Sequence, residues 1–123
     1  MNSFGRTGSE YSGAVLEHFD APLNVGCIDG MESSFLRSAA WGDELQLWLK
    51  LDGENQVAEL KWKCLGAPIV IASASVASEL VIGWQKEQVQ TKLAACLLEQ
   101  LELSAEQRYA ALFVADAIQR AIN

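Results

Sequence analysis

A few side chains in this sequence could bind a metal ion or a metal cluster. Cysteine and histidine are donors that iron and zinc accept, and a carboxylate can complete such a ligand set. The chain contains three cysteines and one histidine, namely Cys27, Cys64, Cys96 and His18. One chemical possibility is therefore a site in which the thiolates of Cys27 and Cys64, the imidazole of His18 and the carboxylate of Asp43 hold the metal.

The same residues also have a structural interpretation, which we favour. Cys64 falls on the apolar side of a predicted strand and Cys96 on the apolar side of a predicted helix, where an unpaired cysteine packs as a small hydrophobic residue. His18 can be explained by a local hydrogen bond. The sequence has no Gly-rich phosphate loop, no nucleophile–base motif and no paired carboxylates placed in a cleft, so it does not indicate an enzyme.

Composition sets the broad class of the protein. A chain of 123 residues, 50% of them hydrophobic, can form one domain with its own core. The formal net charge of −7 repels phosphate backbones and anionic lipid, so we expect no nucleic-acid partner and no membrane partner. Cysteines without a CxxC pair are typical of a reducing compartment, and we expect a cytoplasmic location. The Gly/Ser-rich residues 1–10 predict a flexible arm before a single domain at 11–123.

Three strands are predicted in the first half of the domain, a weak one at 33–40 and two clearly alternating ones at 43–51 and 56–64. In the middle strand, leucines alternate with polar residues and with Trp48, which places Trp48 on the polar face. One apolar and one polar face are typical of an antiparallel sheet that is covered on a single side. A short helix at about 12–19 precedes the strands, and its apolar face is predicted to consist of Val15, Leu16 and Phe19.

Three helices are predicted to supply the cover. A nearly all-apolar helix starts with Pro68 at its first position and ends before Gly83. The next helix spans about 86–99, and the last spans about 104–122, opening with a capping box in which a Ser and a Gln lie three residues apart. Strands followed by helices, without βαβ alternation, predict an α+β fold, a two-layer sandwich with a three-stranded antiparallel sheet covered on one face by helices.

Residues 11–26 read YSGAVLEHFDAPLNVG, with Tyr-Ser, a Val, a His and Pro-x-Asn-Val-Gly at a specific spacing. This segment resembles the opening of the NifU/IscU-type iron–sulfur cluster assembly scaffolds, and His18 matches a position there that is not a cluster ligand. The resemblance continues to about residue 122. Its later matches are Gly42-Asp43, Gly66, Ile71-Ala72-Ser73, Ser75 and Ala115–Ile118.

The resemblance implies a site for an iron–sulfur cluster or zinc, which that family holds with three cysteines and one histidine. Of the family's site residues, this chain retains only Asp43. The family's chaperone-docking motif, Leu-Pro-Pro-Val-Lys, is replaced by the sequence LSAEQ at 103–107. Without its thiolates and imidazole the position cannot hold a cluster, so we expect no cofactor and no tightly bound metal there. The four donor positions are occupied by Trp41, Ala67, Tyr109 and Ala110.

Two interpretations of the aromatic replacements are open. Trp41 and Tyr109 could fill the volume of the lost site, or they could stay partly exposed and anchor a protein partner, as Trp and Tyr often do. The geometry implied by the resemblance places Trp41, Ala67 and Tyr109 close together at one end of the molecule, with Asp43 at the rim. Trp48, on the polar face of the sheet, is a further candidate contact residue.

Three functions are compatible with these observations. The first, which we favour, is a non-enzymatic binding or regulatory paralogue of the scaffolds, with a cysteine desulfurase or another cluster-assembly component as its partner. The second is a metal or cluster carrier that uses other ligands, namely Cys27, Cys64 and Asp43. The third is a domain recruited to an unrelated assembly. The sequence leaves the partner and the oligomeric state open.

Overall fold

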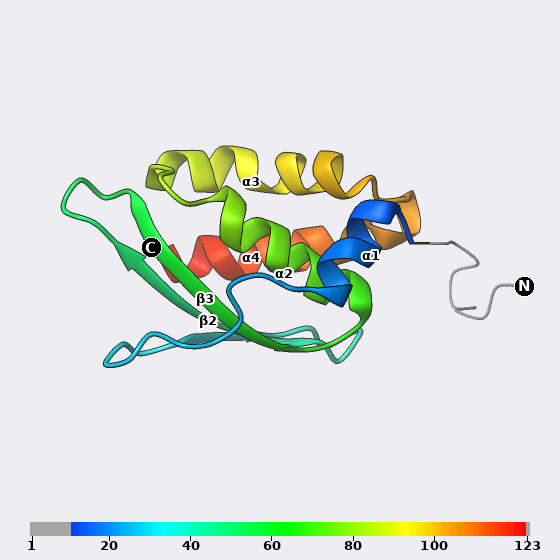
Figure 1. The fold of residues 1–123 in the computed structure, drawn as a ribbon, viewed down its shortest axis with the longest axis horizontal. Helices are drawn as coiled ribbons and strands as arrows, with labels where there is room; N and C mark the ends of the chain where they lie inside the picture. The colour runs from blue at the N-terminus through cyan, green and yellow to red at the C-terminus, as the bar shows by residue number, and fades with distance from the viewer. Residues whose placement is uncertain (1–10, 123) are drawn as a thin grey trace, which may run out of the picture.

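The computed structural model describes residues 11–122 (Figure 1). The arm predicted at 1–10 lies outside the described residues. Helices and strands follow the predicted order, strands before the long helices, and the α+β prediction is confirmed. The elements are α1 (Gly13–Asp20), β1 (Ser34–Arg37), β2 (Glu44–Leu51), β3 (Val57–Leu65), α2 (Pro68–Leu80), α3 (Lys86–Leu101), the 3₁₀ helix η1 (Ala105–Gln107) and α4 (Arg108–Ile122).

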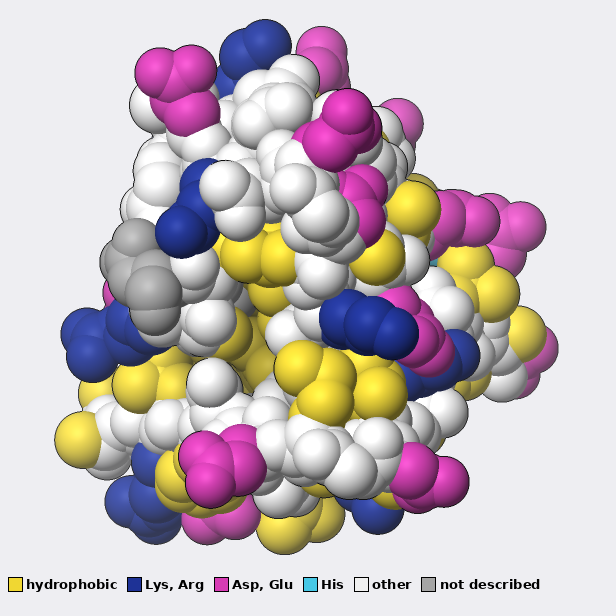
Figure 2. All heavy atoms as spheres, turned by 90° about the vertical axis from the view of Figure 1, so that its left-hand side faces the viewer, with side chains coloured by type: hydrophobic (Ala, Val, Ile, Leu, Met, Phe, Trp, Pro, Cys, Tyr) yellow, Lys and Arg dark blue, Asp and Glu magenta, His cyan; other side chains and the backbone are white. Residues whose placement is uncertain are grey.

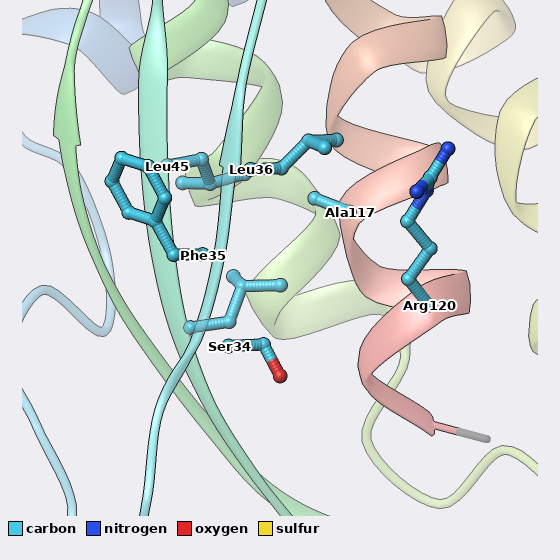
Figure 3. Close-up of a pocket in the computed structure, with 7 residues that line it drawn as sticks. Ser34, Phe35, Leu36, Leu45, Ala117 and Arg120 are labelled. Atoms are coloured by element: carbon cyan, nitrogen blue, oxygen red, sulfur yellow. The ribbon is translucent and has the colours of Figure 1, made fainter.

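The three strands form one antiparallel sheet in the order β1-β2-β3, and the helices lie on one side of it (Figure 1). Leu45 and Leu47 of β2 are 0% and 2% exposed, as their alternation predicts. In Figure 3, Leu36 of β1 points towards α4 across a small cavity of about 20 Å³, whereas Phe35 points away from it. The predicted two-layer sandwich is therefore confirmed.

The central helix α2 begins where its sequence predicts and ends at Leu80, shortly before the predicted stop at Gly83. Pro68 occupies the first turn, where its missing N–H costs no hydrogen bond. Gly83, just beyond the helix, has a φ of +85°, a backbone conformation that glycine adopts without strain. The helix contacts α1, α3, α4 and β3, and nine of its residues are buried. No helix among the described residues is long and apolar enough to cross a lipid bilayer.

The apolar face predicted for α1 is only partly correct. Ser12 caps the helix, since its Oγ accepts the Val15 N–H at 3.2 Å, and the same Oγ donates to the Leu101 carbonyl at 2.6 Å. Val15 is fully buried, but Leu16 and Phe19 are 50% and 42% exposed. This short helix packs mainly on α2, so only the residues on that side are buried.

Trp48 lies on the face of the sheet that its alternation predicts, but it is buried there and not exposed as a contact residue would be. Its ring lies on the outer face of the sheet, opposite Lys61 of β3, yet the residue is only 8% exposed. The Nζ of Lys63 lies 5.7 Å from the ring centroid, within the range of a cation–π contact. Strand alternation gave the correct face but not what covers it, and Trp48 is not accessible to a partner in this structure.

The segment after α1 is fixed against both β3 and α2. Gly26 N–H donates to the Trp62 carbonyl at 3.0 Å, and the indole Nε1–H of Trp62 donates to the Leu23 carbonyl at 2.8 Å. On the helix side, Ser75 Oγ accepts the Leu23 N–H at 2.8 Å, and the Asn24 amide donates to a second serine of α2. These bonds join the opening segment of the chain to the middle of the fold.

The end of the molecule with the β2–β3 turn faces the viewer in Figure 2. Acidic and basic side chains alternate over this face, so the net charge of −7 does not form a broad patch of one sign there. The candidate functional residues lie at the other end of the sheet.

Candidate functional site

An open pocket of about 360 Å³ lies where the β1–β2 loop, the junction between β3 and α2, and the start of α4 meet. This is the right-hand end of the sheet in Figure 1. The structure therefore brings together three of the four replaced donor positions, while Ala110, the fourth, is fully buried in α4 and does not line the pocket. The lining residues are Trp41, Gly42, Asp43, Leu65, Gly66, Ala67 and Tyr109.

Two aromatic rings form one wall of the pocket. Trp41 and Tyr109 are stacked, with their centroids 4.6 Å apart and their planes 24° from parallel. The backbone N–H of Trp41 donates to Ser38 Oγ at 3.2 Å, which helps to hold the β1–β2 loop. Trp41 is nevertheless 59% exposed. The Trp41 ring is therefore not enclosed by the fold.

Asp43 lies at the base of the pocket and not at its rim, which corrects the sequence prediction. The residue is 4% exposed, and its Oδ1 accepts the Ala67 N–H at 3.1 Å. Ala67 is the N-cap of α2 and has no side-chain acceptor of its own. Asp43 therefore supplies, from another part of the chain, the acceptor and the negative charge that a helix N-terminus favours. An alanine at an N-cap is the sequence signal that could have revealed this contact.

Gly66 makes the approach of Asp43 possible. A Cβ built on Gly66 would lie 2.6 Å from Asp43 Oδ1 and 3.2 Å from its Cγ. No real Cβ tolerates such a distance, so any side chain at this position would push the carboxylate away from the start of α2. The sequence resemblance identified Gly66 only as a matching residue, and the structure gives the reason for it.

We expect Gly66→Ala to lower the free energy of unfolding by about 1–3 kcal/mol, the usual cost of forcing an extra carbon into a packed site. Urea denaturation followed by far-UV circular dichroism would measure the loss. Gly53→Ala is a matched control, because a Cβ at Gly53 meets no atom within 4 Å and its φ is not positive. Equal effects of the two substitutions would contradict a role for Gly66 in holding Asp43.

The thiol next to Asp43 is held in its neutral form. Burial, together with the smaller effect of the nearby negative charge of Asp43, raises the pKa of Cys64 to about 12. Because the thiolate and not the thiol is the metal ligand, Cys64 is a poor donor at neutral pH. Cys64 is only partly buried, like Cys96, whereas Cys27 is exposed.

The structure does not assemble the alternative ligand set. Within residues 11–122, no group of three or more His, Cys, Asp and Glu side chains could hold a metal ion. His18 Nδ1 instead lies 2.8 Å from Ser75 Oγ of α2, so the predicted hydrogen bond is present but is not local, because Ser75 lies 57 residues further along the chain. Within this set, Asp43 acts on Cys64 through its negative charge. With neither thiolate nor imidazole at the four family positions, the residues present do not fit an iron–sulfur cluster.

Comparisons with known proteins agree with the observed fold and with the family resemblance of residues 11–26. Residues 10–123 match the family described as the NifU-like N terminal domain. The iron-sulfur cluster assembly scaffold protein IscU of Haemophilus influenzae is 32% identical over 116 residues, covering 91% of this chain and 92% of that protein. Iron-sulfur cluster assembly protein 3 of Arabidopsis thaliana is 32% identical over 117 residues, covering 92% of this chain and 68% of that protein.

Two solved structures share the fold at lower sequence identity. A putative iron-sulfur cluster assembly scaffold protein for the SUF system from Fervidobacterium islandicum superposes with a TM-score of 0.78 at 18% identity, covering 92% of this chain and 96% of that one. A nitrogen-fixing NifU-like protein (N-terminal) from Brucella abortus also gives a TM-score of 0.78, at 15% identity and 90% coverage of each chain.

Proposed function

This chain belongs to the NifU-like N-terminal domain family, and we propose that it acts in iron–sulfur cluster biogenesis by binding another protein, without carrying a cluster itself. The names of its relatives support the pathway, since they are cluster assembly proteins that match nearly the whole chain. The altered pocket supports a role in protein binding without a bound cluster. It combines a scaffold fold with a set of side chains that cannot hold the scaffold's cargo.

The observation that carries this proposal is the exposed ring of Trp41, stacked on a partly buried Tyr109. The stacked rings of Trp41 and Tyr109 stand at the positions of two family ligands, and Trp41 is 59% exposed. Tryptophan and tyrosine are the residues most often found as energetic hot spots of protein interfaces. A family member that keeps the fold and has an exposed tryptophan, stacked on a tyrosine, at the positions of metal ligands has a surface suited to protein contact.

The proposed partner is a component of the cluster-assembly machinery, with a cysteine desulfurase as the first candidate. Such a partner would be occupied or regulated by this chain without transferring sulfur to it, because the family's acceptor cysteines are absent. The protein is not an enzyme in this proposal. Its three free cysteines suit a reducing compartment such as the cytoplasm.

We expect Trp41→Ala to weaken binding to the cysteine desulfurase of the same organism by about tenfold or more, equivalent to about 1.4 kcal/mol. Isothermal titration calorimetry with the two purified proteins would measure the change in Kd. Phe35→Ala is the matched control, since Phe35 is an aromatic residue with 60% exposure that lies outside this pocket. It should leave the Kd unchanged.

Two results would contradict the proposed function. The first is a double variant, Trp41→Ala with Tyr109→Ala, that is folded and binds the partner as tightly as the natural chain. The second is anaerobic reconstitution of the natural chain with iron and sulfide that yields stable thiolate-to-iron absorbance. In that case the chain would be a cluster carrier with other ligands.

A further inference from the structure

The pocket contains a buried anion whose second oxygen is unpaired. Asp43 is 4% exposed, and while its Oδ1 accepts the Ala67 N–H, its Oδ2 has no hydrogen-bond partner among the described residues. A buried carboxylate is costly unless it is paired, and leaving one of its oxygens without a donor adds to that cost. The α2 N-terminus compensates the first oxygen only. Oδ2 of Asp43 therefore lacks a hydrogen-bond donor.

The rings beside this anion suit a cation. Trp and Tyr have the aromatic faces that bind cationic groups most strongly, by about 0.5–2 kcal/mol depending on exposure. Trp41 and Tyr109 line the same pocket as Asp43, and the seven lining residues include no Lys or Arg. Outside the pocket, Arg37 pairs with Glu44 and Arg120 with Asp116, and Lys63 contacts the ring of Trp48.

We propose that this pocket receives an arginine side chain presented by the protein partner, with its guanidinium bound to Asp43 Oδ2 and stacked on the Trp41 ring. The inference rests on the proposed function and specifies the chemistry of the partner at that site. A guanidinium is planar, is always charged and is weakly hydrated, so it can stack on an aromatic ring and pair with a carboxylate at the same time.

A metal ion fits the same pocket less well. Calcium requires six or more oxygen ligands, and magnesium demands an octahedral set. Zinc and iron prefer thiolate and imidazole, but the neighbouring thiol of Cys64 has a pKa of about 12 and stays protonated. Aromatic faces contribute nothing to such a site, whereas they contribute directly to binding a guanidinium.

Entry of the guanidinium requires part of the pocket lining to move, because Asp43 Oδ2 is buried. The Trp41 indole belongs to that lining and is 59% exposed, so a bound guanidinium would lie against it. Occupation of the pocket should consequently change the environment of Trp41 more than that of Trp62, which is 2% exposed.

The test uses the natural chain and three capped tripeptides, Gly-Arg-Gly, Gly-citrulline-Gly and Gly-Lys-Gly. Titration would be followed by the indole N–H signals of the tryptophans in ¹H–¹⁵N NMR spectra. The arginine peptide should shift the Trp41 signal in a saturable way, whereas the citrulline peptide, which has the same shape but no charge, should not. Lysine should bind more weakly than arginine. Equal shifts from the arginine and citrulline peptides, or no shift from arginine, would overturn the proposal, and tighter binding of lysine would overturn the assignment to arginine.

Two variants test whether the arginine peptide binds at Asp43 and Trp41. Asp43→Asn keeps an oxygen for the Ala67 N–H but removes the charge, and it should weaken arginine binding about tenfold, as expected for loss of a charged hydrogen-bond partner. Trp41→Leu should also weaken it. Asp116→Asn is the control, because Asp116 is an exposed acid outside the pocket, and it should leave binding unchanged. An effect of Asp116→Asn equal to that of Asp43→Asn would overturn the site.

Failure of this inference is distinguishable from failure of the proposed function. If Trp41→Ala weakens desulfurase binding but Asp43→Asn does not, the partner contacts the rings without an arginine, and only the inference fails. If the natural chain binds the arginine peptide but no cluster-assembly protein, the pocket is correctly assigned and the proposed function is wrong.

Discussion

A variant with three restored donors, Trp41→Cys, Ala67→Cys and Tyr109→His, is expected to bind one zinc ion per chain, whereas the natural chain is expected to bind none tightly. The three positions line one pocket together with Asp43, so the variant would present two thiolates, one imidazole and one carboxylate. Zinc accepts such sets in tetrahedral geometry. The expected gain is the largest of any change considered, since structural zinc sites in zinc-finger peptides contribute about 10–16 kcal/mol.

A competition titration against a chromogenic chelator would measure the zinc affinity, and cobalt substitution would report thiolate ligation by its visible absorbance. Adding Asp43→Asn to the triple variant is the matched control, because it removes the fourth donor and should weaken binding. A triple variant that folds but does not bind zinc would show that the pocket positions do not converge on one ion. If the natural chain bound zinc tightly and lost this binding on Cys64→Ala, the expectation that it has no metal site would be wrong.

Trp62→Ala is expected to lower the free energy of unfolding by about 3–5 kcal/mol, the usual cost of removing a large aromatic side chain from a core. Trp62 is 2% exposed, lies opposite Leu47 in the sheet and donates its indole N–H to the Leu23 carbonyl. The substitution thus removes core volume and the shorter of two hydrogen bonds to the Leu23 carbonyl, the other coming from Ser78 Oγ at 3.3 Å. A loss of this size is a large fraction of the stability of a small domain.

Chemical denaturation in guanidinium chloride would measure this loss. Trp62→Phe should cost less, because it keeps most of the ring volume and removes only the N–H donor. Trp41→Ala should change stability by less than about 1 kcal/mol, as is usual for an exposed position. If the two alanine substitutions destabilised the chain equally, Trp41 would belong to the core, and its proposed role in partner contact would lose its basis.

The sheet and the central helix could be predicted because short stretches of sequence specify the buried face of β2 and the limits of α2 without contacts from distant segments. Alternating leucines on β2 specify one buried face, and Leu45 and Leu47 are indeed buried. Pro68 and Gly83 mark the limits of α2 through backbone restrictions that do not depend on the rest of the fold. The convergence of Trp41, Ala67 and Tyr109 also came from the sequence, but through resemblance and not through physical reasoning about the residues.

The features that could not be predicted depend on contacts between distant segments. The burial of Asp43 depends on Ala67 and Gly66, which lie more than twenty residues further along the chain. The burial of Trp48 depends on what covers the outer face of the sheet, which strand alternation does not specify. In α1, Val15 is buried and Leu16 and Phe19 are exposed because α2 packs against one side of that helix.

The hydrogen bonds between the opening segment and β3 have a consequence for self-association. In the strand order β1-β2-β3, β3 is an outer strand, and outer strands with free amides and carbonyls are templates for aggregation. Here the Trp62 carbonyl accepts the Gly26 N–H and the Trp62 N–H donates to the Asn24 carbonyl, so the middle of this strand is already occupied. The other outer strand, β1, is only four residues long. Both borders of the sheet are thereby protected against fibril-like addition of a second chain.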